Sequence, residues 1–62
     1  MVLKKLKQIM IDKELSVEDL ASAVMVSSRT ILNAQKGRGV SLNTGRRIAK
    51  GVGMDLKDLK DE

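Results

Sequence analysis

The chain has 62 residues, enough for one small domain with a thin core. It contains no Cys or His, which excludes disulfides, histidine base chemistry and zinc sites built from these residues, and we expect neither a metal nor a cofactor. No apolar run approaches the roughly 18 residues that a membrane span needs. We therefore expect a cytoplasmic protein without a membrane partner.

The net charge of +4 is distributed unevenly along the chain. Charges cancel in residues 1–19, whereas residues 20–54 contain six basic residues and no acid, and residues 55–62 contain four acids and two lysines. A basic middle with neutral or acidic flanks indicates a polyanionic partner. A basic surface kept only for solubility would give the same pattern, so charge alone leaves both interpretations open.

Helical periodicity begins at the N-terminus, where one apolar stripe contains Val2, Leu3, Leu6, Ile9 and Met10. Lysines off this stripe would also suit a membrane-surface or calmodulin-target helix. Such helices usually carry aromatic residues, which this chain lacks. We therefore expect a first helix that packs on the core.

Four polar residues are expected to begin the later helices as N-caps: Ser16, Ser27, Ser41 and Asp55. Gly37 and Gly53 are expected to end the third and fourth helices. The apolar stripes contain Val17, Leu20, Ala21 and Val24 in the second helix, Leu42, Ile48, Ala49 and Val52 in the fourth, and Leu56 and Leu59 in the last. The sequence thus predicts an all-α single domain, 1–62, of five short helices.

The third predicted helix has two chemically different faces. At about 100° per residue, one face contains Ser28, Arg29, Leu32, Asn33 and Lys36, and the opposite face contains Ile31, Ala34 and Gln35. Arg can donate two hydrogen bonds to guanine, and Asn can pair with the edge of adenine. Any surface helix is polar on its outside, so this helix alone does not separate DNA readout from an ordinary solvated face.

Several segments together resemble a known family: 15–21, 26–31 with Gly37, 41–44, 47–50 and 53–59. Over nearly its whole length the chain is similar to the helix-turn-helix domain of Cro and the lambdoid phage repressors, the XRE family. This resemblance implies a compact five-helix, lambda-repressor-like DNA-binding domain with its helix-turn-helix at about 16–36. It also implies binding to a double-stranded DNA operator, with the recognition helix, about 27–36, in the major groove.

The resemblance implies three groups of site residues. Base contacts are expected from Ser28, Arg29, Leu32 and Asn33. Phosphate contacts are expected from Ser27, Lys36, Arg38 and Asn43, and from the backbone N–H groups of Val17 and Val40. A weak homodimer on DNA is expected through Leu56, Lys57, Asp58 and Leu59. No catalytic residue and no small-molecule substrate is expected.

The sequence also departs from the family pattern at five positions. Val17 replaces the usual Gln and keeps only its backbone N–H, at a helix N-terminus that favours anions. Met25 replaces the turn glycine, so a left-handed conformation there would cost about 1 kcal/mol. Met10 and Gln35 replace a buried Arg–Glu pair, and Gly45 replaces a core Leu.

Other functions are less well supported by the residues. An antitoxin-like or scaffold module on the same fold, or an engineered or drifted domain with weakened DNA binding, remains an alternative to a repressor or Cro-like regulator. An enzyme using the acids in residues 12–19 is disfavoured, because Glu18 and Asp19 suit a helix first turn and a thin domain has little room for a pocket. RNA binding is disfavoured because no aromatic side chain is present to stack on bases.

Overall fold

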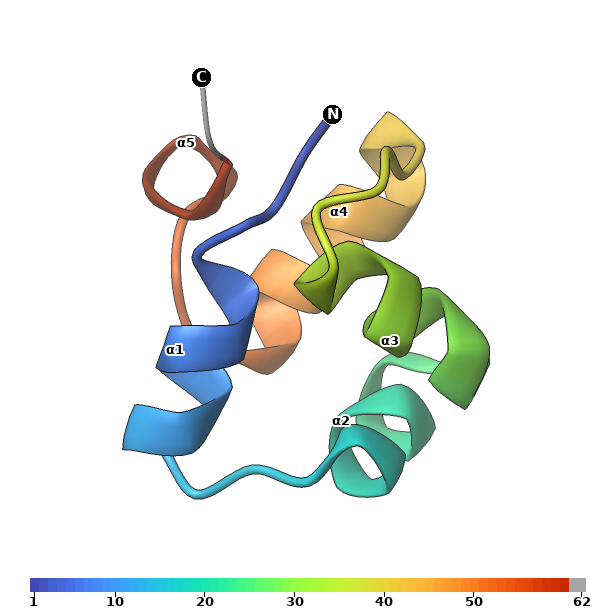
Figure 1. Ribbon diagram of the computed structural model, residues 1–62, viewed down its shortest axis with the longest axis vertical. Helices are drawn as coiled ribbons and strands as arrows, with labels where there is room; N and C mark the ends of the chain where they lie inside the picture. Colours follow the sequence, from blue (N-terminus) through green and yellow to red (C-terminus); the bar gives the residue numbers. More distant parts are fainter. Residues whose placement is uncertain (61–62) are drawn as a thin grey trace.

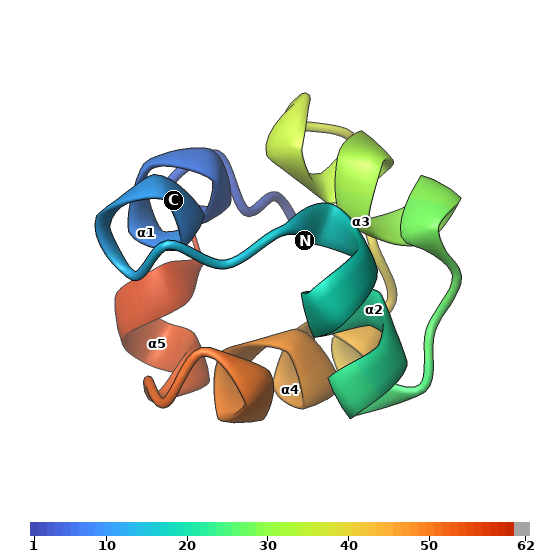
Figure 2. The ribbon, with the colours of Figure 1, turned by 90° about the horizontal axis from the view of Figure 1, so that it is seen from below.

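The computed structural model describes residues 1–60, so the last two residues of the expected domain lie outside the described part. The described residues form five helices: α1 (Leu6–Asp12), α2 (Val17–Val24), α3 (Ser28–Gln35), α4 (Leu42–Gly51) and α5 (Leu56–Leu59). Helix α2 packs against both α3 and α4, α1 packs against α3, and α5 packs against α4 (Figures 1 and 2). The expected all-α, five-helix fold is confirmed. Within residues 1–60, no helix combines the length and apolar character required to cross a bilayer.

The three serines expected as N-caps start α2, α3 and α4. In each case the serine Oγ accepts the backbone N–H three residues later, at 3.0–3.2 Å: Ser16, Ser27 and Ser41. Asp55 precedes α5, but its carboxylate makes no capping hydrogen bond. Short-range hydrogen bonding therefore sets the first residue of the three central helices.

Helices α1 to α4 all end in the same backbone motif. A residue with positive φ follows each helix: Glu14 (58°), Met25 (60°), Gly37 (84°) and Gly53 (75°). The next residue then donates its N–H to the carbonyl five positions earlier, as in a Schellman motif. The sequence predicted helix ends at both glycines and considered a left-handed conformation at Met25 in place of the family's turn glycine, whereas Glu14 is an unexpected case.

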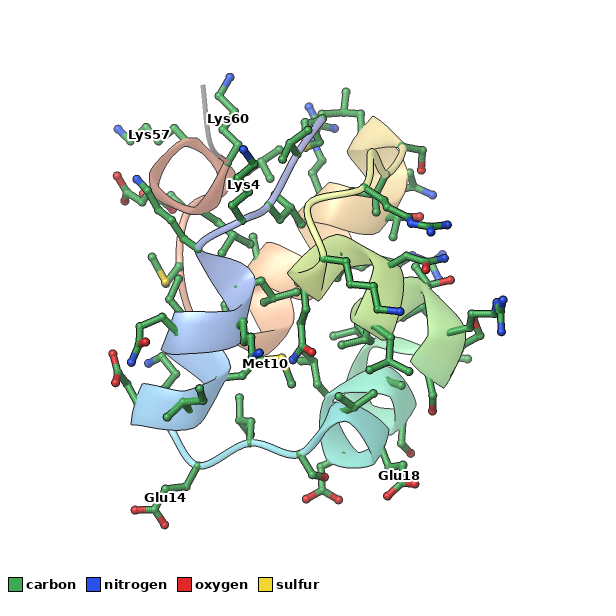
Figure 3. All side chains as sticks on the ribbon, in the orientation of Figure 1. Lys4, Met10, Glu14, Glu18, Lys57 and Lys60 are labelled. Carbon is green, nitrogen blue, oxygen red and sulfur yellow. The ribbon has the colours of Figure 1, made fainter. Side chains whose placement is uncertain are left out.

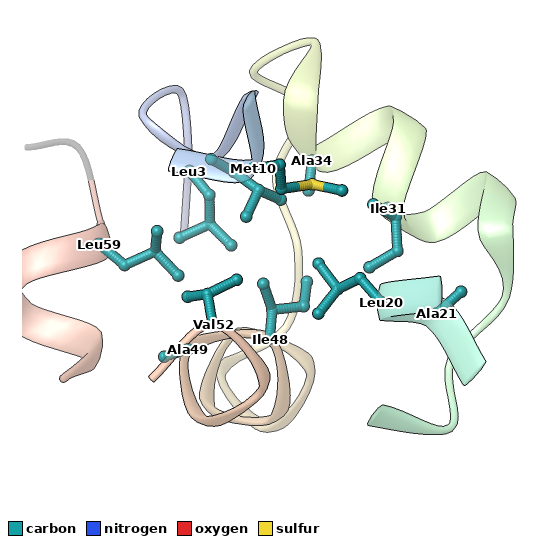
Figure 4. Close-up of a cluster of buried hydrophobic side chains, with 11 residues drawn as sticks. Leu3, Met10, Leu20, Ala21, Ile31, Ala34, Ile48, Ala49, Val52 and Leu59 are labelled. Carbon is teal, nitrogen blue, oxygen red and sulfur yellow. The ribbon is translucent and has the colours of Figure 1, made fainter. Parts of the chain in front are cut away.

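Eleven apolar side chains form the core: Leu3, Leu6, Met10, Leu20, Ala21, Ile31, Ala34, Ile48, Ala49, Val52 and Leu59 (Figure 4). Charged side chains such as Glu14, Glu18 and Lys57 point outward (Figure 3). Leu42, expected in the apolar stripe of α4, is instead 51% exposed. That expectation was wrong because Leu42 is the first residue of α4, on the side that turns away from the core.

The N-terminal residues pair with the loop that follows α3. The Met1 nitrogen donates to the Val40 carbonyl at 2.9 Å, and the Val40 N–H donates to the Met1 carbonyl at 2.8 Å. Because this pairing holds the first residues outside the helix, α1 begins at Leu6 and the expected helical start at Val2 is wrong. Leu3 is nevertheless fully buried.

Gly45 is buried on α4, where the family resemblance implies a leucine. A Cβ built at Gly45 would lie 2.6 Å from the Met1 Sδ and 3.4 Å from the Leu56 Cδ1. The side chains of Met1 and Leu56 therefore occupy the space that the missing Leu would fill.

Candidate nucleic-acid interface

The outer face of α3 contains the residues expected to contact bases. Ser28, Arg29 and Leu32 are exposed, Asn33 is half-buried, and Lys36 continues the exposed face just beyond the helix. The opposite face of α3 is buried through Ile31 and Ala34. Figures 1 and 2 both show α3 at the surface of the domain. The structure thus brings the expected base-contact residues together on one solvent-facing surface.

Both ends of α3 are fixed by local hydrogen bonds. At the start, the Ser27 Oγ accepts the Thr30 N–H at 3.1 Å and lies 2.8 Å from the Thr30 Oγ1. At the end, Gly37 donates to the Ala34 carbonyl at 3.1 Å and Arg38 donates to the Asn33 carbonyl at 3.0 Å. The positive φ at Gly37 thereby places exposed Arg38 immediately beyond α3.

The inner side of α3 is held against α1 by an unusual polar contact. The Gln35 Nε2 donates a hydrogen bond to the Met10 Sδ at 3.1 Å. These are the two positions where the family resemblance implies an Arg–Glu pair. An uncharged contact occupies the same place, so neither partner brings a buried charge that would need neutralising.

The expected phosphate contacts differ in their availability. Val17 is half-buried and packs on the core, while its N–H lies in the first turn of α2, where helix N–H groups lack intrahelical partners. Ser27 is exposed, although its Oγ already caps α3. Asn43 is exposed in the first turn of α4.

Val40 does not suit the phosphate contact expected of it. Its N–H already donates to the Met1 carbonyl at 2.8 Å, and its own carbonyl accepts from the Met1 nitrogen. A phosphate would have to replace a short hydrogen bond that fixes the loop. The Val40 N–H is therefore less available for the expected phosphate contact, which stays a prediction.

The expected dimer surface is smaller than the sequence indicated. Lys57 and Asp58 are exposed, and Leu56 is half-buried against the core. Leu59 has no exposed surface at all, because its side chain completes the core beneath α5. Leu59 is thus wrongly placed among the dimer contacts, which leaves Leu56, Lys57 and Asp58.

The acidic residues between α1 and α2 do not converge on a common site. Asp12, Glu14, Glu18 and Asp19 are all exposed, and Figure 3 shows Glu14 and Glu18 pointing outward from separate positions. Within residues 1–60, no three acidic side chains gather in a way that could hold a metal ion.

One surface feature was not expected from the sequence. A groove of about 410 Å³ lies between the C-terminal parts of α2 and α4, although the domain had been expected to have little room for a pocket. It is lined by Ala23, Val24, Met25, Arg47, Lys50 and Gly51. The sequence signal that could have indicated this groove is Met25, a long apolar residue at the family's turn-glycine position. In the structure Met25 has a left-handed backbone and its side chain is 82% exposed.

Comparison with known proteins agrees with this architecture. The family model described as a Cro/C1-type HTH DNA-binding domain matches residues 5–61. No curated protein and no solved structure gives a significant match to the chain. The match covers all five helices, including the capped α2 and α3 and the exposed outer face of α3. The chain therefore belongs to the Cro/C1-type helix-turn-helix DNA-binding domain family.

Proposed function

We propose that this domain is a sequence-specific transcriptional regulator, a repressor or Cro-like protein, that inserts α3 into the major groove of its operator. The observation that carries this proposal is the outer face of α3. It exposes an arginine, a serine and a leucine beside a half-buried asparagine on one helix whose two ends are fixed. This is the combination of a rigid helix and hydrogen-bonding side chains that base readout in the major groove requires.

Each residue of that face has a distinct proposed role. Arg29 donates two hydrogen bonds to a guanine, and Asn33, one turn later, pairs with an adenine. Leu32 is 43% exposed, so its side chain is available to contact a thymine methyl group. Ser28 lies in the first turn of α3 and meets a base edge or a phosphate.

Phosphate contacts on both sides of α3 supply most of the affinity in this proposal. Lys36 and Arg38 are exposed at the C-terminal end of α3, and Asn43 is exposed in the first turn of α4. The backbone N–H of Val17 contributes from the first turn of α2, and the Ser27 hydroxyl contributes from the start of α3. In place of Val40, the first N–H groups of α4 take the phosphate, because helix N-termini attract anions and these groups have no intrahelical partner.

The proposed operator complex contains two copies of the domain. Leu56, Lys57 and Asp58 offer a small, mostly charged contact surface, so the homodimer is weak in solution and forms mainly on DNA. Two-fold symmetry of such a dimer requires a two-fold-symmetric operator with half-sites about one helical turn apart.

Selection of bound sequences from a pool of random duplexes at low salt tests the proposal. Enrichment of a two-fold-symmetric site is the expected result, and a variant with Arg29→Ala and Asn33→Ala should enrich no site while remaining folded. If the parent protein enriches no sequence and binds no duplex even at low salt and high protein concentration, the proposed function is wrong.

A further inference from the structure

The α2–α4 groove has an apolar wall and a basic rim. Ala23, Val24 and Met25 provide the apolar wall from the end of α2, and Arg47 and Lys50 provide two cations from α4. Gly51 of α4 also lines the groove. Helix α2 approaches Gly51 closely, because a Cβ built at Gly51 would overlap the Val24 Cγ1 and lie 2.9 Å from the Leu20 Cδ1. The missing side chain at Gly51 therefore brings the two helices together at this point.

Met25 is the most exposed large apolar residue of the described chain, at 82%. Its φ of 60° and ψ of 43° are left-handed values that cost a non-glycine residue about 1 kcal/mol. Strained residues with an exposed apolar side chain often mark a functional contact. The base contacts proposed for the outer face of α3 do not include the Met25 side chain.

The charges around the groove have one sign. No acid occurs anywhere between Leu20 and Met54, so every residue from the middle of α2 to the end of α4 is neutral or basic. Helix α2 lies between α3 and α4 (Figure 2). The groove is lined by residues of α2, its C-cap and α4, and by none of α3. A partner in the groove would therefore approach from the side away from the outer face of α3.

We propose that the α2–α4 groove docks an acidic amphipathic helix of a partner protein. An apolar side chain of that helix lies against Met25 and Val24, and carboxylates one turn away pair with Arg47 and Lys50. Charge complementarity selects this occupant, because an apolar wall on α2 that faces two cations on α4 matches a helix with leucines on one stripe and acids on the next. The groove is open along one side, so it does not enclose a small molecule, whereas a helix brings its own cover.

A blocked synthetic helical peptide provides the probe, with Leu at positions i, i+3 and i+7 and Glu at the flanking positions. When this peptide is titrated into isotope-labelled protein, the amide NMR signals of residues 23–25, 47, 50 and 51 should shift. Two control peptides, one with Lys in place of every Glu and one with Ser in place of every Leu, should bind at least roughly tenfold more weakly.

A matched pair of variants separates groove contacts from general attraction. Arg47→Glu should weaken the acidic peptide at least roughly tenfold, whereas the neighbouring Arg46→Glu, which has the same charge change outside the groove, should weaken it much less. Met25→Gly should weaken binding without reducing stability. All three variants should be compared with the parent by circular dichroism and by affinity for duplex DNA.

Four results would overturn the proposal. The first is equal loss of peptide affinity in Arg47→Glu and Arg46→Glu, and the second is a set of peptide-induced shifts centred on α3. The third is a dimer of the unliganded protein that Arg47→Glu dissociates, which would make a second copy the occupant. The fourth is a larger loss of DNA affinity in Arg47→Glu than in Arg46→Glu, which would make the groove part of the DNA interface. The first three measurements do not depend on DNA binding, so they test the groove even if the proposed operator recognition fails.

Discussion

The side-chain amide of Gln35 on α3 donates a hydrogen bond to the thioether sulfur of Met10 on α1, at 3.1 Å. Met10 is 2% exposed, so this contact joins two helices at the edge of the core. The hydrogen bond holds α3, which carries the proposed base contacts, against α1, which carries none. An ion pair at these two positions would serve the same purpose only if both charges were introduced together.

A double-mutant cycle at these positions should therefore show strong coupling. Met10→Arg alone should lower the free energy of unfolding by about 3 kcal/mol or more, because it buries an unpaired charge. Gln35→Glu alone should lower it by about 1–3 kcal/mol through loss of the amide donor. The double variant should be close to the parent in urea unfolding. Additive losses would show that the two side chains do not share one contact.

Two glycines of α4 should respond in opposite directions to alanine. Gly45→Ala places a Cβ against the Met1 Sδ, which belongs to a flexible side chain that can rotate away. Part of the helix-propensity gain of up to about 1 kcal/mol should therefore appear as a higher free energy of unfolding. Gly51→Ala places a Cβ against the branched Val24 side chain and should lower stability by about 1–3 kcal/mol. Thermal or urea unfolding of both variants checks this, and stabilisation by Gly51→Ala would show that α2 does not pack there.

Gly45→Leu, which restores the residue that the family resemblance implies, should destabilise the domain. Met1 and Leu56 already fill the space beside Gly45, so the larger side chain should cost about 1–3 kcal/mol by overpacking.

Met25→Gly should raise the free energy of unfolding by about 1 kcal/mol, because glycine adopts a φ of 60° without strain. The Met25 side chain is 82% exposed, so little buried apolar surface is lost. Glu14→Gly is the matched control, since Glu14 has a φ of 58° and is also exposed. Both gains should appear in urea unfolding; a loss in either variant would mean that its side chain makes a stabilising contact.

The sequence was most informative where a single short segment determines the structure. The caps at Ser16, Ser27 and Ser41 and the left-handed turns at Met25, Gly37 and Gly53 each depend on hydrogen bonds within a few residues. The two-sided character of α3 follows from helical periodicity alone. These features could be predicted with no knowledge of the rest of the chain.

The errors arose where distant segments meet. The pairing of Met1 with Val40, 39 residues away, both shortens α1 and occupies the N–H that had been expected to contact phosphate. Leu59 carries the same apolar signal whether it faces the core or a partner, and only the packing of α5 shows that it is buried. Periodicity identifies an apolar face but does not specify what covers it.

Phosphate contacts should make DNA binding strongly dependent on salt. Each ionic contact adds about 0.9 to the slope of log affinity against log salt concentration. Replacing Lys36 and Arg38 with Ala in both copies of a dimer should therefore lower the slope by roughly 4. Titrations of an operator duplex at several salt concentrations measure this, with Lys7→Ala as a control that removes an exposed charge from α1, outside the proposed phosphate contacts. An unchanged slope in the Lys36 and Arg38 variants would remove both residues from the phosphate contacts.

Arg29 should determine specificity, whereas Lys36 should mainly determine affinity. Arg29 is exposed in the first turn of α3, with Asn33 one turn later. Truncation of a base-reading arginine should cost about 1–3 kcal/mol, concentrated at one base pair of each half-site. A phosphate-bound arginine would instead weaken every sequence alike.

Arg29→Ala and Arg29→Lys, tested against all single-base variants of the selected operator, separate these two roles. Lysine keeps the charge but lacks the planar fork that donates two hydrogen bonds to guanine. Arg29→Lys should therefore recover much of the affinity lost in Arg29→Ala without recovering discrimination at the affected base pair. Lys36→Ala, as the contrasting variant, should lower affinity while keeping the parent's ranking of operators. If Arg29→Ala also keeps that ranking, base discrimination falls to Asn33, Ser28 or the shape of the DNA.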